Sequence, residues 1–225
     1  MNSINAHPNF FESLDSAALA DEQHNRERIL MAAATLFANK GYAGTSVREI
    51  VEVATVTKPT LYYYFKNKED LYVKLMDMAM QTFSMLLDES LVRTGTMRKR
   101  LVALYMDIYR LFHENIDLLR LVNSVIYGPR GATPPYDILK VSDRLDAVFH
   151  AILDGGIREG ELNEENRDDV MLLLIGILRS IQILLVLNMP HRTITPKAIA
   201  GAIDIVFDGA RNVLSETRKT QGGIK

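Results

Sequence analysis

Four polar side chains within residues 58–64 have the chemistry to contact a nucleic acid. Lys58 carries an ammonium group, Thr60, Tyr62 and Tyr64 carry hydroxyl groups, and Leu61 is the main aliphatic residue among them. A short helix that holds such groups outward, braced by a hydrophobic partner, can donate hydrogen bonds to base edges in the major groove of DNA. The residue types and their spacing therefore indicate a recognition helix.

Five further polar residues flank this segment and can hold the DNA backbone. Ser46 and Thr57 stand at expected helix N-termini, where free backbone N–H groups and the helix dipole favour a phosphate. Asn67 and Lys68 begin the following helix, and Arg48 lies in the first turn of the preceding one. Each residue alone also fits an ordinary role as a helix cap or a solvated surface group. Their arrangement, rather than any one of them, points to DNA.

The run of three tyrosines supports the same interpretation. Tyr62, Tyr63 and Tyr64 are consecutive, and successive residues of a helix point about 100° apart, so they cannot all be buried on one side. At least one must face solvent. An exposed phenol can donate to a phosphate or stack on a sugar, and the alternative is that the rings form the amphipathic rim of a core.

The elements that would position these residues are helical. Ile29, Ala33, Leu36 and Phe37 form the apolar stripe of a core-facing helix, which Gly41 is expected to end. Thr45 or Ser46 caps the next helix, with Glu49 at capping-box distance from Ser46. Thr57 caps the recognition helix, and Pro59 lies in its first turn, where a missing N–H is harmless.

Longer helices follow, and no stretch alternates with the period of a strand. Their expected spans are 67–93, 97–113, 115–127, 135–158, 165–188 and 196–218. The predicted fold is all-α, with a three-helix helix-turn-helix head and a six-helix bundle, about nine helices in all. The predicted division is a flexible tail at 1–24, a DNA-binding domain at 25–70, and a ligand-binding and dimerisation domain at 71–225.

Composition excludes several classes of protein. The 225 residues contain no cysteine, the five histidines have no metal-ligand spacing, and no catalytic motif or phosphate-binding glycine loop is present. We therefore expect no enzyme, metal or cofactor. Residues 25–75 carry a net charge of +3 within a chain of net charge −2, which places the basic charge where DNA contact is expected.

The sequence also indicates a cytoplasmic protein. The N-terminus is polar and acidic, without the basic start and apolar segment of a signal peptide. The segment 170–187 is long and apolar, but Arg179, Ser180 and Gln182 lie near its middle, where an arginine costs about 2.5–3.5 kcal/mol in a bilayer. We expect a buried or subunit-interface helix there rather than a membrane span.

Residues 26–75 resemble the DNA-binding domain of the tetracycline-repressor (TetR) family of bacterial transcription regulators. The resemblance rests on K-G-Y at 40–42, T-S-V-R-E-I at 45–50 and T-L-Y-Y-Y-F-K-N-K-E-D-L at 60–71, all in register. It implies a helix-turn-helix head on a helical ligand-binding, dimerising body, with the last two long helices forming a four-helix interface with a partner subunit. The positions that it implies contact DNA are Arg48, Lys58, Pro59, Thr60, Tyr62, Tyr64 and Lys68.

One departure from the family pattern lies in the turn. The usual A-G-V is Ala54-Thr55-Val56 here, and threonine lacks the ease of glycine at positive φ. An altered or slightly strained turn is the expected consequence.

The body offers aromatic, methionine and polar residues for a small-molecule site, although such stripes are more often plain core. The candidates are Tyr105, Met106, Tyr109, Phe112, Asn123, Tyr127, Arg179 and Gln182. Arg179 and Gln182 are the best polar anchors because they interrupt the most apolar helix, and they fit an interface between subunits equally well.

Two helices are apolar on more than one face, which favours a homodimer. The residues expected at its interface are Leu174, Ile177, Ile181, Ile199, Ile203 and Phe207. A two-fold dimer would set two recognition helices about one DNA turn apart, ~34–36 Å.

The sequence therefore predicts a dimeric, ligand-responsive transcription regulator, most simply a repressor that leaves a palindromic operator when an apolar or amphipathic effector moves helix 67–93. An activator of the same family fits equally. A helical enzyme or a lipid-binding or small-molecule-binding bundle with an incidental helix-turn-helix is the alternative from another class.

Overall fold

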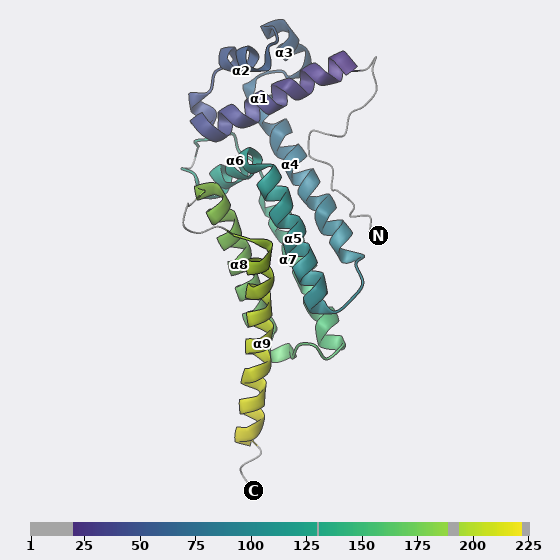
Figure 1. Ribbon diagram of the computed structural model, residues 1–225. Helices are drawn as coiled ribbons and strands as arrows, with labels where there is room; N and C mark the ends of the chain where they lie inside the picture. Colours follow the sequence, from purple (N-terminus) through teal and green to yellow (C-terminus); the bar gives the residue numbers. More distant parts are fainter. Residues whose placement is uncertain (1–19, 130, 189–193, 222–225) are drawn as a thin grey trace. The chain divides into compact units, whose positions relative to one another are not determined.

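The computed structural model of the chain describes residues 20–129, 131–188 and 194–221, with side chains from 24 to 209 within these ranges. Within these ranges all of its regular secondary structure is helical and there is no strand, as predicted (Figure 1). The helices are α1 (Ala20–Gly44), α2 (Val47–Ala54), α3 (Lys58–Tyr64), α4 (Lys68–Leu91), α5 (Met97–Glu114), α6 (Ile116–Tyr127), α7 (Leu139–Arg158), α8 (Arg167–Leu187) and α9 (Pro196–Gln221). A short 3₁₀ helix at Glu164–Asn166 precedes α8.

The predicted spans agree with these helices to within three residues except at two ends. α1 begins at Ala20, so the last residues of the predicted tail are helical, whereas residues 1–19 lie outside the described residues. α7 begins at Leu139 rather than at 135. Gly155 and Gly156 lie within α7, and Gly160, which follows the helix, has the positive φ of +74°.

The contacts divide the chain into two compact units. The first contains the described residues up to Thr82 together with Leu111–Ile138, and the second contains Phe83–Arg110 and the described residues from Leu139 onward. The predicted division placed a single boundary after residue 70, whereas here α6 belongs to the same unit as the three helices of the DNA-binding head. In addition, α4 and α5 each run from one unit into the other.

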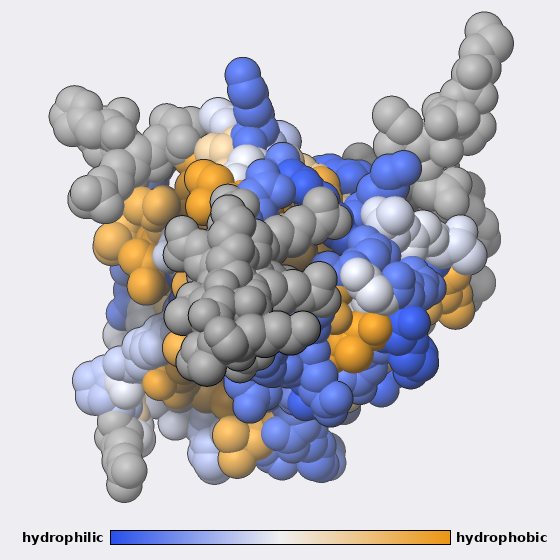
Figure 2. All heavy atoms as spheres, turned by 90° about the horizontal axis from the view of Figure 1, so that it is seen from below, coloured by the Kyte–Doolittle hydropathy of each residue, from blue (hydrophilic) through white to orange (hydrophobic). Residues whose placement is uncertain are grey.

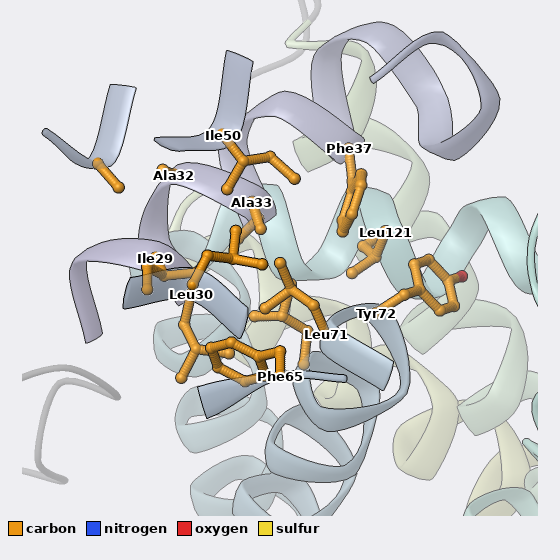
Figure 3. Packing of buried hydrophobic residues seen from close by; sticks show 14 of the residues in the cluster. Ile29, Leu30, Ala32, Ala33, Phe37, Ile50, Phe65, Leu71, Tyr72 and Leu121 are labelled. Carbon is orange, nitrogen blue, oxygen red and sulfur yellow. The ribbon is translucent and has the colours of Figure 1, made fainter. Parts of the chain in front are cut away.

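The first unit has one hydrophobic core built by helices distant in sequence. α2 and α3 pack on one side of α1 and α6 on the other (Figure 1). Leu30 and Phe37 from α1, Ile50 from α2, and Leu71 from α4 turn toward one another, and Leu121 from α6 closes the group (Figure 3). Each fully buried aliphatic side chain contributes about 1.5–3 kcal/mol, so Leu118 and Leu121 of α6 together add a few kcal/mol to the stability of the head.

In the second unit α8 packs along α9 and also contacts α7. The inward face of α8 consists of Val170, Met171, Leu174, Leu178 and Ile181, all buried. Tyr105 and Phe149 face each other in this core, with ring centroids 5.9 Å apart. The unit also contains a buried carboxylate, Asp107, which is held by Arg93 and Arg110.

Candidate DNA-binding surface

The first short helix of the head begins with a complete capping box. The Ser46 hydroxyl accepts the backbone N–H of Glu49 at 3.2 Å, and the Glu49 carboxylate accepts from the backbone N–H and the hydroxyl of Ser46, each at 2.8 Å. Hydrogen bonds from the Lys40 ammonium and from Ser46 lower the pKa of Glu49 to about 2. The predicted cap is therefore confirmed. A phosphate at Ser46 would have to displace a charged carboxylate from the same helix end.

The turn between α2 and α3 has a left-handed residue at the threonine. Thr55 adopts φ +54° and ψ +45°, the left-handed conformation that the family's glycine adopts freely. The Arg28 guanidinium donates to its carbonyl at 3.1 Å and ties the turn to α1. A β-branched residue in this conformation costs about 1–2 kcal/mol, so the turn stores strain, as the sequence predicted.

Thr55→Gly is therefore expected to raise the free energy of unfolding by about 1 kcal/mol, because glycine relieves the strain and gives back part of the gain as unfolded-state entropy. Thr94→Gly is the matched control, since Thr94 is also exposed but does not have a positive φ. Urea denaturation followed by circular dichroism measures both. A Thr55→Gly variant no more stable than Thr94→Gly would contradict the strain.

α3 is held by its inner side chains and presents one polar face outward. Leu61 is fully buried, and Phe65 directly after the helix is 1% exposed against the same core. Lys58, Pro59 and Tyr62 are all exposed, at the i, i+1 and i+4 positions that share a helix face. The Thr57 hydroxyl caps the helix by accepting the Thr60 backbone N–H at 3.2 Å, as predicted.

The three tyrosines separate as the helical period requires. Tyr62 and Tyr63 are 51% and 71% exposed, whereas Tyr64 is half-buried against the core and meets Tyr63 edge-on at 4.9 Å. Sequence reasoning chose Tyr62 and Tyr64 as DNA contacts and left out Tyr63. Tyr63 comes four residues after the exposed Pro59, a spacing that places both on the same side of a helix, and this spacing is the signal that indicates its exposure.

The remaining predicted contacts divide into exposed groups and one engaged group. Arg48, Lys58 and Tyr62 have no hydrogen-bond or ion-pair partner among the described residues, so these side chains are available to a ligand. Asn67 caps α4 by accepting the Asp70 backbone N–H at 2.8 Å and remains exposed. Lys68 is different, since its ammonium donates to the carbonyls of Tyr42 at 2.8 Å and Thr45 at 2.9 Å.

Lys68 thus links the start of α4 to the connection between α1 and α2, and it also lies 4.2 Å from the Tyr42 ring centroid. An ammonium has three donors, so two carbonyl contacts leave one for a phosphate. The structure gives this lysine a positioning role that its place in the motif did not reveal, because both acceptors lie more than 20 residues away in sequence.

Lys68→Met is expected to lower the free energy of unfolding by about 2 kcal/mol, because it removes a charged donor and leaves two carbonyls unpaired. Lys66→Met removes the same charge from an exposed neighbouring side chain and serves as the control. Denaturant unfolding compares the two variants. If Lys68→Met weakens DNA binding but unfolds like Lys66→Met, Lys68 is only a phosphate contact.

The predicted ligand-binding residues fall in both units. Phe112, Asn123 and Tyr127 belong to the first, and Tyr105, Met106, Tyr109, Arg179 and Gln182 to the second. Tyr105 is fully buried, and its hydroxyl donates to the Leu174 carbonyl while burial raises its pKa. Arg179 donates to the Gln182 side-chain oxygen at 2.9 Å within α8. The latter two side chains therefore pair with each other.

Five of the six residues predicted at the dimer interface are buried inside the subunit. They are Leu174, Ile181, Ile199, Ile203 and Phe207, and Ile177 is half-buried. A helix that is apolar all round does not reveal in its sequence which face turns inward. Among the described residues, the large hydrophobic side chains of α8 and α9 that do reach the surface are Leu172, Leu173, Ile183, Leu187 and Ile205.

A helix, a tight turn and a second helix with an outward polar face, joined to a larger helical body, define a helix-turn-helix DNA-binding protein. Residues 29–75 match the sequence model of the tetR family of bacterial regulatory proteins. The chain is 31% identical over 141 residues to the HTH-type transcriptional regulator YdgC of Bacillus subtilis. The aligned region covers 58% of the chain and 71% of YdgC. The chain belongs to the TetR family of transcriptional regulators, and the resemblance in its sequence is confirmed.

Two other relatives differ in how far they match. The probable HTH-type transcriptional regulator YttP of Bacillus subtilis is 34% identical over 99 residues, 43% of the chain, and the chain spans only about half of its length, 48%. The transcriptional regulator FadR of Bacillus subtilis in complex with stearoyl-CoA has the same fold, with a TM-score of 0.64 at 20% identity over 81% of the chain and 98% of FadR. Relatives of this kind are regulators and not enzymes.

Proposed function

We propose that the protein is a homodimeric repressor that binds a palindromic operator through α3 and leaves it when a small apolar or amphipathic effector binds. The outward face of α3 carries this proposal. Its exposed ammonium and phenol groups have no competing partner among the described residues, and two buried side chains fix the helix on the core. That combination supports direct contact with base edges and phosphates.

Glycines on α8 and α9 support the homodimer. Gly176 and Gly201 lie inside these helices, and a methyl group on either would meet nothing within 4 Å in the described subunit. A glycine inside a helix costs about 0.8–1 kcal/mol relative to alanine, and no packing within the subunit accounts for it. Close approach of helices from a second subunit would account for these glycines, because small residues let two helix backbones come together.

Exposed apolar residues strengthen this assignment. Leu172, Ile183 and Leu187 occupy one side of α8 together with Gly176 and Ser180, and all five are exposed. Ile205 on α9 is 74% exposed. Seen from below, hydrophobic areas interrupt the hydrophilic surface in several places (Figure 2). Burying such side chains against a second copy is favourable at about 25 cal/mol per Å² of apolar surface.

The same face explains why α8 is so apolar. Residues 164–187 are long and hydrophobic enough to cross a membrane by length and composition, and 33% of the apolar 18-residue window within them is buried in the subunit. One such helix is weak evidence for a span. A dimer interface accounts for the remaining apolar surface without a bilayer, and we propose that the protein works in the cytoplasm, where its DNA is.

Two features support an effector. Met106 and Tyr109 are half-buried neighbours on α5, and the FadR structure with stearoyl-CoA demonstrates that this fold can hold an amphipathic ligand. On α6 the Asn123 side-chain oxygen is buried and accepts no hydrogen bond from the described residues. A buried unpaired acceptor is costly, and a ligand or a water molecule that donates to it would remove the cost.

The proposed signal travels through α4 and α6. α4 runs from the second unit into the head, where Lys68 ties it to the carbonyls of Tyr42 and Thr45. α6 contributes core residues to the head, and the Thr35 hydroxyl donates to its Asp117 at 2.8 Å. An effector that favours another position of either helix would change operator affinity by differential binding to the two states.

Selection of DNA from a random library tests the proposal. A repressor dimer should enrich a palindrome with half-sites about one helical turn apart, ~10 bp. Gel shifts at fixed salt would then give its affinity, and a reporter placed behind the palindrome would be less active when the protein is present. Enrichment of no sequence would count against operator binding, and a more active reporter would indicate an activator.

A further inference from the structure

α3 is too short to fix its own direction. It has seven residues, about two turns, and Leu61 is its one buried residue. A helix of this length is marginal on its own in water, so contacts from neighbouring helices decide how it lies. The direction of α3 therefore depends on what holds its two ends.

The start of α3 is held by an arginine of α1. In the preceding turn, the backbone N–H groups of Thr55 and Val56 donate to carbonyls of α2 at 3.1 Å and 3.0 Å. The Thr55 carbonyl accepts from Arg28 Nη2 at 3.1 Å, across 27 residues of sequence. A charged guanidinium donor makes a stronger hydrogen bond than a neutral donor does. Arg28 therefore connects the start of α3 to α1.

The other end of α3 is held by a second arginine. Phe65 directly follows the helix, and its backbone N–H donates to the Leu61 carbonyl at 2.9 Å. Its ring lies in the core of the head with Leu30 and Leu71 (Figure 3). The Arg26 guanidinium lies over this ring, 5.8 Å from the centroid, which is within the range of a cation–π interaction.

The two arginines reach different ends of α3 because of their spacing. Arg26 and Arg28 are two residues apart, so their side chains leave α1 about 200° apart, on nearly opposite sides of the helix. Both are half-buried, and both precede residues 29–75, the part of the chain that matches the family model. α1 thus holds α3 at both ends through residues that the family model does not include.

We propose that Arg26 and Arg28 are positioning residues that fix the direction of α3 and so set how sharply the protein distinguishes its operator from other DNA. This rests on the proposed function of α3 as the recognition helix. Groups that read base edges must be held within about 0.5 Å and 10–20° of their productive geometry. Contacts to phosphates carry no sequence information, so they tolerate a displaced helix better. Neither arginine itself contacts DNA.

Gel shifts with the selected operator and with a random-sequence duplex of the same length test the proposal, at a temperature where every variant is folded. Arg26→Met and Arg28→Met should each lower operator affinity about tenfold and random-duplex affinity less than about twofold. Arg28→Lys keeps a cationic donor for the Thr55 carbonyl and should recover most of the loss. Lys74→Met is the control, because it removes an exposed charge from the same unit, and it should change neither affinity.

Salt dependence separates positioning from direct contact with DNA. Removing a positioning residue should leave the slope of log operator affinity against log salt concentration unchanged. Removing a phosphate contact lowers that slope by about 1 for each head. A lower slope, or an equal loss of affinity for both duplexes, would identify a phosphate contact and overturn the proposal. Wild-type operator affinity in both methionine variants would overturn it as well.

Hydrogen exchange of the free protein tests the same role without DNA. The backbone N–H groups of Leu61 and Phe65, bonded at 3.1 Å and 2.9 Å, should exchange about tenfold faster in Arg26→Met and Arg28→Met, because α3 opens locally. The N–H of Ala33, inside α1, should change much less. Equal acceleration at all three positions would show that the arginines only stabilise the head as a whole, which contradicts positioning. If the wild type selects no operator, the proposed function fails, and the exchange rates still decide whether α1 holds α3.

Discussion

The double variant Lys58→Ala with Tyr62→Ala will bind the selected operator at least about 100-fold more weakly than the wild type and will remain a folded dimer. Both side chains are exposed on the outward face of α3, and neither belongs to the core. Losing a specific contact costs about 1–3 kcal/mol, and a dimer loses each contact in both heads. The free energy of unfolding should change little, because truncating exposed side chains usually changes it by less than about 0.5 kcal/mol.

Salt dependence identifies what Lys58 contributes. If it neutralises a phosphate, the slope of log affinity against log salt concentration should fall by about 1 for each head. Lys74→Ala removes an exposed lysine from α4 and should leave the slope nearly unchanged. Gel shifts at several potassium chloride concentrations measure both. An unchanged operator affinity in the double variant would contradict the assignment of α3 as the recognition helix.

The head was predictable wherever its structure is determined by neighbours in sequence. The hydroxyl of Ser46 accepts the backbone N–H of Glu49 at the start of α2, and the hydroxyl of Thr57 accepts that of Thr60 at the start of α3, so each cap lies within four residues. Gly41 has a φ of +76° and interrupts the helical geometry where a glycine was expected to end the first helix. Caps and left-handed positions depend on local backbone geometry, so residue type alone indicates them.

Contacts between distant residues were not predictable in the same way. The amine of Lys68 is directed to carbonyls more than 20 residues away, and nothing in its motif separates that role from a phosphate contact. The core of the head also includes Leu118 and Leu121 of α6, which a boundary drawn near residue 70 leaves out. An apolar stripe predicts burial but does not identify its partner.

The inward face of α8 illustrates the same limit for the body. Apolar residues occur on all sides of α8, so the sequence indicated both a core face and a subunit-interface face without showing which side chains belong to each. The structure places Leu174 and Ile181 inside and leaves Leu172 and Ile183 outside. The prediction of a subunit interface on α8 and α9 therefore remains, with a different set of side chains.

Leu172→Lys combined with Ile183→Lys will convert the dimer into a monomer and lower operator affinity by at least about 100-fold. The two residues are 11 positions apart and therefore share one side of α8. Four lysines would then face one another across a two-fold interface, where each must lose its hydration without a partner. A monomer binds a single half-site and forfeits the 10²–10⁴-fold gain of linking two heads, roughly.

Light scattering coupled to size exclusion measures the mass, and gel shifts measure the affinity. Val92→Lys is the control, because Val92 is 81% exposed in the same unit but lies outside α8 and α9. It should leave mass and affinity unchanged. Circular dichroism should give the same helix content for both variants, since every substituted side chain is exposed. If the double-lysine protein stays dimeric, the exposed face of α8 is not the subunit interface, and the glycines of α8 and α9 need another explanation.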